Sequence, residues 1–322
     1  MLQQRACRAV VREAVKYFVS GSSFPRANIK RVAAAVEWRL MSCHANYIGH
    51  LDVWMREALA LGNDSQEIML DSGAFTAWNK GEDVGLKHLI RAYASFIKRY
   101  ERKTKAVWLI NLDRIPGRKG GPEPTGEEIT AAIHESDENY RALVAEFGAR
   151  VLPVFHQGEP ETRLREVAGM GDYICVSPRN DVPEQSRVRW CRAVHARVKN
   201  KTHGLATTGV LMATTIPWHS TDSAAYVIRA SLGMVFVDLG DTVRSLNISK
   251  DSPARYEAGR HFDSMSKAKQ DFLRAKFEAR GFTVEELRTK MWSRASFSVL
   301  EIIDWNYRKQ IVPINEPSLF GV

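Results

Sequence analysis

The feature that most restricts the fold of this sequence is a repeated alternation of short apolar runs with longer segments of helical periodicity. Near-continuous apolar strands, each followed by a helix, are typical of a parallel sheet that is covered on both faces. Eight strand candidates recur from about residue 40 onward, which favours a closed (β/α)8 barrel over an open doubly wound sheet. The candidates are residues 39–45, 67–71, 106–113, 150–157, 172–177, 202–207, 218–222 and 234–239.

Helix candidates fill the gaps between these strands and continue beyond the last of them. One of them follows Thr125 and has Glu128 three residues on, which is the spacing of a capping box. Residues 118–126 are rich in Gly, Pro and charge and predict a mobile loop. We expect a TIM-type barrel domain at residues 1–250 and a helical C-terminal extension at residues 251–322 that packs on it. The helix candidates are residues 86–103, 126–148, 266–281 and 298–312.

The start of the chain predicts a basic amphipathic helix within the barrel domain. Val11, Val15, Phe18 and Val19 fall on one face of it, and no secretory apolar segment is evident. Hydrophobic residues make up 44% and charged residues 26% of the chain, which is typical of a globular protein. No apolar run approaches the roughly 18 residues that a membrane span requires. We expect a cytoplasmic protein with no membrane partner.

The formal net charge of +9 makes a polyanionic partner such as nucleic acid a reasonable hypothesis, because each neutralised phosphate releases counterions. Charge alone does not separate such a protein from other basic proteins. The four cysteines, Cys7, Cys43, Cys175 and Cys191, match neither a disulfide framework nor a paired CxxC metal motif. Free buried thiols are the better interpretation.

Polar residues fall at or just after the C-terminal ends of successive strand candidates. In a closed barrel these ends converge on the face where active sites lie, so side chains far apart in sequence are expected to meet there. A single polar residue at a strand end is ordinary, because every strand exits to water somewhere. The residues in this position are Asp71, Asp113, His156, Gln157, Ser177, His203 and Asp222.

Asp71 and Asp222 share a local pattern, since each is followed by Ser and then by small residues. Small neighbours allow a substrate to approach the backbone closely, and Phe75 can supply an aromatic wall. The structural alternative is a helix N-cap for each aspartate and a core position for Phe75.

These motifs, in this order, resemble those of the tRNA-guanine transglycosylases. LDSGAF is similar to their DSGGF/Y motif, and NLD, VFHQGE, YICVSP, HGLATTG and DSAAY then follow strand by strand across roughly residues 65–230. Within that superfamily the set most resembles the DpdA-type 7-deazaguanine DNA transglycosylases, which are often phage-encoded. The resemblance implies a pentosyltransferase that exchanges guanine in DNA for a free 7-deazaguanine, such as 7-cyano-7-deazaguanine, in a phage-infected host, without cofactor or metal.

The resemblance also implies a role for each of the main polar residues. Asp222 takes the place of the nucleophile that holds the sugar, and Asp71 that of the acid and base that serves the purine nitrogen. Asp113 would accept from the guanine donors, and the Gln157 amide would donate to O6. The further substrate contacts are Ser72, Phe75, Ser177, Gly204 and Leu205. His156 and His203 would position the sugar or phosphate, unless backbone carbonyls satisfy them. Arg114, Arg118 and Lys119 would border the site and hold phosphates, unless they form only a solvated loop.

Two departures from the tRNA-modifying enzymes narrow this hypothesis. Those enzymes carry a zinc site of three Cys and one His near the C-terminus, whereas no cysteine follows Cys191 here. The Gln that commonly follows their DSGGF/Y motif is replaced by Thr76. Loss of the RNA-handling parts favours DNA over tRNA as the polymer. A tRNA-guanine transglycosylase and a non-catalytic nucleic-acid-binding barrel remain as alternatives.

Overall fold

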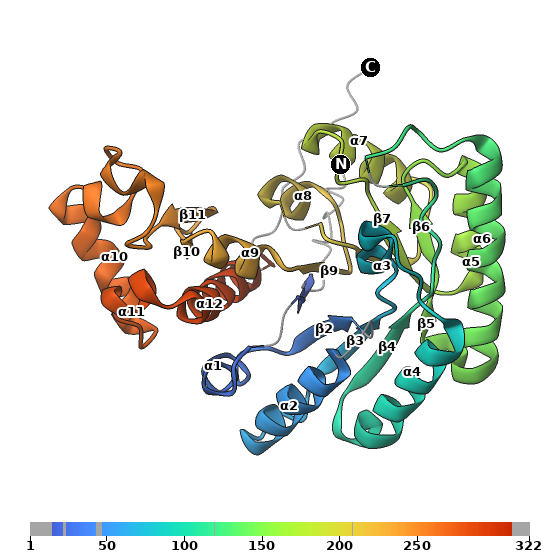
Figure 1. Cartoon of the computed structure of the whole chain (residues 1–322), viewed down its shortest axis with the longest axis horizontal. Helices are drawn as coiled ribbons and strands as arrows, with labels where there is room; N and C mark the ends of the chain where they lie inside the picture. The colour runs from blue at the N-terminus through green and yellow to red at the C-terminus, as the bar shows by residue number, and fades with distance from the viewer. Residues whose placement is uncertain (1–14, 22–23, 43–46, 119, 208, 311–322) are drawn as a thin grey trace, which may run out of the picture.

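Parallel strands form a barrel in the computed structural model, which describes residues 15–21, 24–42, 47–118, 120–207 and 209–310 (Figure 1). Nine strands form one sheet in the order β5-β4-β3-β2-β1-β9-β8-β7-β6, with every neighbouring pair parallel. The strands are β1 (Lys16–Val19), β2 (Trp38–Ser42), β3 (Glu67–Asp71), β4 (Ala106–Ile110), β5 (Val151–Leu152), β6 (Val154–His156), β7 (Tyr173–Ser177), β8 (Lys201–Gly204) and β9 (Ser220–Ser223).

The two edge strands of this order, β5 and β6, are halves of one strand that Pro153 interrupts. Proline has no N–H to give to a ladder, which accounts for the break. The Pro153 carbonyl still accepts a hydrogen bond of 2.8 Å from the Cys175 amide on β7. The nine segments therefore occupy eight positions and the ring closes, which confirms the predicted (β/α)8 barrel.

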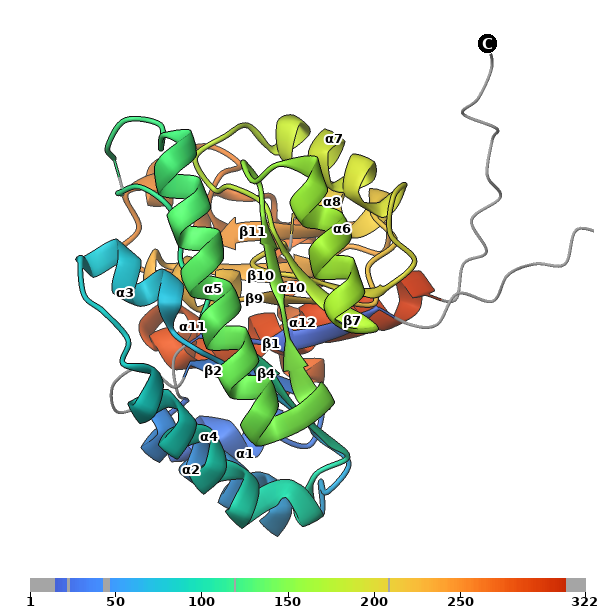
Figure 2. The same cartoon turned by 90° about the vertical axis from the view of Figure 1, so that its right-hand side faces the viewer.

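Helices follow the strands and cover the outside of the barrel (Figure 2). They are α1 (Arg26–Val32), α2 (Tyr47–Ala60), α3 (Ala74–Lys80), α4 (Leu86–Tyr100), α5 (Gly126–Phe147), α6 (Glu161–Met170), α7 (Glu184–His195), α8 (Val210–Thr215) and α9 (Ala225–Ser231), with 3₁₀ turns η1 (Glu101–Lys103) and η2 (Gly148–Arg150). The capping box expected at the start of α5 is present, with Thr125 and Glu128 bonded to each other's backbone N–H. Of the four cysteines, Cys175 and Cys191 are free and buried, whereas Cys7 and Cys43 lie outside the described residues.

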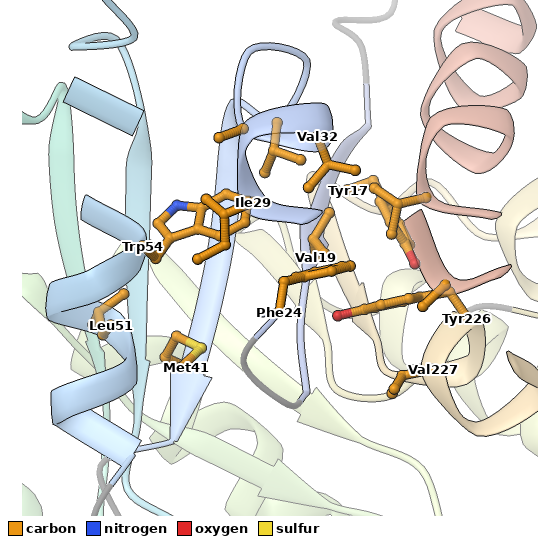
Figure 3. Close-up of a cluster of buried hydrophobic side chains, with 14 of the residues drawn as sticks. Tyr17, Val19, Phe24, Ile29, Val32, Met41, Leu51, Trp54, Tyr226 and Val227 are labelled. Carbon is orange, nitrogen blue, oxygen red and sulfur yellow. The ribbon is translucent and has the colours of Figure 1, made fainter. Parts of the chain in front are cut away.

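The alternation of side chains along each strand divides the core into two parts. Inward-facing residues such as Phe18, Leu40 and Met69 fill the barrel interior. Outward-facing neighbours such as Tyr17 and Val19 pack against α1, α2 and α9 (Figure 3). At the N-terminal ends of the strands, an ion pair of 2.7 Å between Lys16 and the buried Glu67 links β1 to β3. The opposite, C-terminal end of the barrel carries the polar residues singled out from the sequence.

The expected N-terminal helix is wrong over residues 16–19, which form β1, and residues 1–14 lie outside the described residues. Tyr17, Phe18 and Val19 are all buried, two against the helices and one inside the barrel. A helix placed on the surface would bury only one stripe of its side chains. Burial on both faces is the property of a parallel strand, and it outweighs the helical spacing of the valines.

The strand expected at 234–239 is present as β10 (Met234–Asp238) but does not belong to the barrel. It pairs antiparallel with β11 (Val243–Asn247) in a separate two-stranded sheet. The short connection closes with a 2.9 Å hydrogen bond from the Leu239 amide to the Thr242 carbonyl. The sequence pattern indicates where strands form but not which strands pair. The barrel position expected for residues 234–239 is occupied by β1.

Helices follow the hairpin and lie beside the barrel (Figure 1). They are the 3₁₀ turns η3 (Pro253–Tyr256) and η4 (Phe262–Ser264) and the helices α10 (Lys267–Ala279), α11 (Val284–Thr289) and α12 (Met291–Gln310). Asn306 on α12 donates a 2.8 Å hydrogen bond to the Val15 carbonyl next to β1. Within the described part of the chain, no helix combines the length and the apolar character that crossing a membrane requires.

Met69→Ala tests the interior packing of the barrel. Met69 is fully buried among the inward-facing side chains, so its truncation should lower the free energy of unfolding by about 2–5 kcal/mol. Denaturant unfolding measures this loss. Phe272→Ala is the control, because Phe272 on α10 is 54% exposed and its loss should cost about 0.5 kcal/mol or less. Equal losses in the two variants would contradict the packing described above.

Candidate active site

Asp71 ends β3, and the chain turns sharply straight after it. Gly73 has a φ of +84°, a conformation that favours glycine, and serves as the N-cap of α3. Ser72 is fully buried, and its hydroxyl accepts from the Ala74 amide at 3.3 Å. The small residues of DSGAF therefore build the turn into α3. The Ser72 hydroxyl faces this turn, and the structure gives no support to its predicted contact with substrate.

The carboxyl group of Asp71 has an unusual protonation equilibrium. Burial raises its pKa most, and the charges of Asp113 and Asp222 raise it further, to about 7. Hydrogen bonds from the Gly73 backbone and from Ser42 on β2 lower the pKa but do not offset these effects. The three aspartates, which come from β3, from the segment after β4 and from β9, are thus close enough to interact electrostatically. A carboxyl group with a pKa near 7 exists in both forms at neutral pH and can donate or accept a proton.

Asp113 and His156 form a buried pair. The Oδ2 atom of Asp113 lies 2.7 Å from Nε2 of His156, and the two residues are 7% and 8% exposed. Burial alone would lower the pKa of His156, but the hydrogen bond and the charge of Asp113 outweigh it and raise that pKa. The pair unites two residues that we predicted as separate substrate contacts. One carboxylate oxygen of Asp113 is engaged by His156, which leaves Oδ1 for any other donor.

A tight turn follows β6 and orients Gln157. Glu159, which the sequence analysis did not single out, accepts a 2.9 Å hydrogen bond from the His156 amide. Gly158 in this turn has a φ of +114°. The Gln157 side-chain oxygen accepts from the Arg179 amide at 3.1 Å, and its backbone amide donates to the Ser177 carbonyl at 3.0 Å. With the oxygen engaged, the amide nitrogen of Gln157 is the group left to act as a donor.

Asp222 lies near the end of β9 and is held by a strained loop. Its Oδ1 atom accepts a 2.8 Å hydrogen bond from the Ala206 amide. Ala206 has a φ of +52° and is the only non-glycine residue with a positive φ in the described part of the chain. Backbone strain of this kind persists only where the surroundings fix it, and it gathers at functional sites. The strained conformation of Ala206 directs its N–H toward the Asp222 carboxylate.

The turn that carries Ala206 is closely packed. A Cβ atom on Gly204 would lie 2.2 Å from the Thr207 hydroxyl and 3.0 Å from the Trp218 ring, so only glycine fits. Leu205 packs on the barrel interior, and Arg187 of α7 donates to the Ala206 carbonyl at 3.4 Å. Neither Ala206 nor Arg187 was predicted, because a backbone N–H donor and its support leave no residue-type signal.

His203 is completely buried, which argues against the predicted contact with sugar or phosphate. Its Nε2 atom lies 3.5 Å from Oδ1 of Asp222, and its Nδ1 atom lies 2.6 Å from the Ser220 hydroxyl. The ring edge packs against Phe18 at 5.6 Å between centroids. His203 therefore lies behind the aspartate and contacts it from the barrel interior.

Phe75 is 51% exposed on the first turn of α3, so the alternative of a core position is wrong. Its ring stacks on Trp78 with centroids 6.1 Å apart. The Trp78 indole donates to the Gly117 carbonyl at 3.0 Å, which ties α3 to the loop after β4. The aromatic pair thus borders the loop that we predicted to bind phosphates.

The three basic residues predicted in this loop differ in their surroundings. Arg114 makes ion pairs of 2.6 Å with Asp83 and 2.8 Å with Glu135, so its charge is already compensated. Arg118 is exposed and makes no ion pair with the described residues. Lys119 lies outside the described residues. Arg118 is the better placed of the two described residues to meet a phosphate.

Possible metal ligands and cavities complete the description of the site. Within the described residues, no cluster of three or more His, Cys, Asp or Glu side chains has the arrangement of a metal site. A cavity of about 60 Å³ lies on the outer side of β9, where Tyr17, Thr221 and Trp305 help to line it. None of the three aspartates lines this cavity, so it is separate from the polar cluster.

No protein-family model matches the chain, and no curated protein matches it. The chain is similar to N-(5′-phosphoribosyl)anthranilate isomerase from Pyrococcus furiosus, with 12% identity, coverage of 66% of this chain and 89% of that chain, and a TM-score of 0.34. It is also similar to the tryptophan synthase complex of Pyrococcus furiosus, with 9% identity, coverage of 69% and 91%, and a TM-score of 0.38. Likeness at this level identifies neither a family nor an activity, and the barrel assignment depends on the chain's own strand order.

Asp71→Asn tests the environment of the Asp71 carboxyl group. Because the folded-state pKa is about 7 against an ordinary 3.8, the folded chain binds a proton that the unfolded chain releases between these pH values. The contribution of Asp71 to stability is thus greatest below pH 4 and is lost as pH rises to about 7. The variant lacks this loss, so it should gain stability relative to wild type as pH rises, by on the order of a few kcal/mol.

Denaturant unfolding at several pH values between 4 and 8 measures the difference. Asp64→Asn, at an exposed aspartate after α2, is the control and should show no such trend. A constant difference between wild type and Asp71→Asn across this range would contradict the raised pKa.

Proposed function

We propose that this protein is a nucleic-acid guanine transglycosylase that exchanges guanine in DNA for a free 7-deazaguanine through a covalent aspartyl-nucleoside intermediate. The proposal is based mainly on the different surroundings of two aspartates at the same end of the barrel. Asp222 is held by a backbone N–H, whereas Asp71 has a pKa of about 7. Retaining glycosyl transfer requires two carboxyl groups, one that attacks as the nucleophile and one that donates and accepts a proton.

The first half of the reaction breaks the bond between guanine and the sugar. The target nucleotide is extruded from the stack so that its C1′ atom can reach the site. A carboxylate oxygen of Asp222 bonds to C1′ as the C1′–N9 bond breaks, and the electron pair of that bond passes to N9. Protonated Asp71 supplies the proton that neutralises the departing base.

The second half reverses these steps with a different base. Deprotonated Asp71 accepts the N9 proton of the incoming 7-deazaguanine, and N9 bonds to C1′ as the ester to Asp222 breaks. Two displacements at C1′ restore its original configuration. A pKa near 7 suits Asp71 to both roles, because the same group must give a proton in one half-reaction and take one in the other.

Recognition of the base is assigned to Asp113 and Gln157. Guanine presents N–H donors at N1 and at its amine, and an acceptor at O6. The free Oδ1 of Asp113 suits the donors, and the Gln157 amide, whose oxygen is already bonded to the Arg179 amide, suits O6. Adenine would leave the buried Asp113 carboxylate and the half-buried Gln157 amide unpaired, a mismatch that costs several powers of ten in rate.

The surroundings of the site support a polymer as the substrate. Protein surfaces that bind nucleic acid place cations against phosphates and stack aromatic rings on bases. This protein has a net charge of +9, an exposed Arg118 and an exposed Phe75 ring. DNA is preferred over tRNA on the resemblance to the DpdA-type enzymes.

Asp222→Asn tests the reaction and separates it from binding alone. Wild-type protein, incubated with labelled 7-cyano-7-deazaguanine and either duplex DNA or tRNA, should label the DNA. The variant should lose this exchange by at least about 10⁴-fold, since the nucleophile is gone, while it keeps its DNA affinity.

Each other outcome of this experiment has a defined meaning. Label in tRNA alone would replace DNA by tRNA as the polymer. Equal exchange by wild type and Asp222→Asn would overturn the assignment of the nucleophile. DNA binding without any exchange by wild type would leave a non-catalytic binding barrel. Asp83→Asn, which changes an exposed carboxylate outside the cluster, should retain exchange.

Arg118→Ala tests the phosphate contact. If Arg118 neutralises one phosphate, the variant should bind DNA more weakly, and the slope of log affinity against log salt should fall by about 1. Titration of fluorescent DNA at several salt concentrations measures both effects. Arg150→Ala is the control, because Arg150 precedes β5 at the opposite end of the barrel and pairs with Glu101. Identical slopes for wild type and Arg118→Ala would exclude this contact.

A further inference from the structure

A chain of buried polar side chains runs through the barrel interior to Asp222. The Tyr173 hydroxyl on β7 hydrogen-bonds the Ser220 hydroxyl on β9, and Ser220 lies 2.6 Å from Nδ1 of His203 on β8. His203 in turn places Nε2 3.5 Å from Oδ1 of Asp222. All four residues are buried. Phe18 and Cys175 pack around these four side chains, and the His219 ring contacts the Tyr173 ring edge-on, with centroids 5.2 Å apart.

Buried polar groups in proteins are almost always paired, so the hydrogens of these four side chains must be arranged to satisfy each group. Burial holds the pKa of Tyr173 well above its usual range, and the hydroxyl therefore keeps its proton. Ser220 is its one hydrogen-bond partner among the described residues, so Tyr173 donates to Ser220. Ser220 then has its own proton to donate to Nδ1 of His203.

This direction decides the tautomer of the neutral imidazole. When Nδ1 accepts, the ring proton is on Nε2, and Nε2–H faces the Asp222 carboxylate. Any arrangement in which Nδ1 donates to Ser220 would leave either the Tyr173 proton or the Ser220 proton without an acceptor among the described residues. In a neutral ring it would also set the Nε2 lone pair against a carboxylate. In the static structure Nε2 has no hydrogen-bond partner among the described residues, and Asp222 at 3.5 Å is its neighbour.

We propose that His203 is a positioning residue for the nucleophile, with its Nε2–H turned to Oδ1 of Asp222 by the relay from Tyr173 through Ser220. The Ala206 amide donates to this same oxygen at 2.8 Å. The Ala206 hydrogen bond and the facing Nε2–H both lie at Oδ1, which leaves Oδ2 as the oxygen that bonds to C1′ when the C1′–N9 bond breaks. His203 neither transfers a proton nor contacts the nucleoside. The inference builds on the proposed function and adds which carboxylate oxygen attacks and what orients it.

Two substitutions of His203 separate the contacts of its two nitrogens. The amide of Gln reaches the position of Nε2 and can donate to Asp222, whereas the shorter amide of Asn reaches only the Ser220 side. His203→Asn should lower kcat for base exchange by about 10- to 100-fold with an unchanged KM for the free base, because a misaligned nucleophile slows chemistry without weakening binding. His203→Gln should recover most of kcat. Equal losses in both variants, or wild-type kcat in His203→Asn, would overturn the positioning role.

The tautomer is measured independently of any reaction. Nitrogen-15 NMR of the imidazole in wild-type protein should show His203 with a proton on Nε2 and none on Nδ1, and the His203→Gln spectrum assigns the signal by its absence. A proton on Nδ1, alone or together with Nε2, would contradict the relay. Should wild type show no exchange with DNA or tRNA, the proposed function falls, whereas the tautomer still decides the direction of the hydrogen bonds.

Discussion

Three aspartates lie at one end of a closed sheet, and their mutual repulsion governs the protonation of the site. Asp71, Asp113 and Asp222 come from β3, from the segment after β4 and from β9, and only closure of the barrel brings their charges together. Like charges in a partly buried setting cannot all ionise freely. The chain resolves this conflict differently for each of the three.

Each solution gives a carboxyl group a different chemical character. Asp113 gains the imidazole of His156, whose pKa it raises, and so forms a compensated pair. Asp222 gains the strained amide of Ala206 and has His203 behind it. Asp71 is left without a cation and keeps its proton up to a pH near 7. Three identical side chains thereby become a base-recognition group, a held nucleophile and a proton carrier in the proposed reaction.

The sequence predicts the parts of this arrangement that depend on periodicity and residue type. Seven of the eight strand candidates lie in the barrel, and the aspartates at their ends do converge. The sequence does not predict which strands pair, so it favours a barrel position for β10, which lies outside the barrel. The helical spacing of the valines near residues 11–19 favours a helix where β1 forms. It also does not reveal the Ala206 amide, which is a backbone group, or the burial of His203, which depends on the register between β8 and β9. Side-chain identity marks where chemistry is possible, whereas donors, burial and protonation follow from packing.

The most direct test of this division of labour is to identify the residue that becomes bonded to the sugar. Protein quenched with denaturant during base exchange on DNA is digested with nuclease and protease, and the peptide that retains a deoxyribose is mapped by mass spectrometry. We expect the deoxyribose to be attached to Asp222. Attachment to Asp71, to Asp113 or to any other residue would contradict the assignment of the nucleophile.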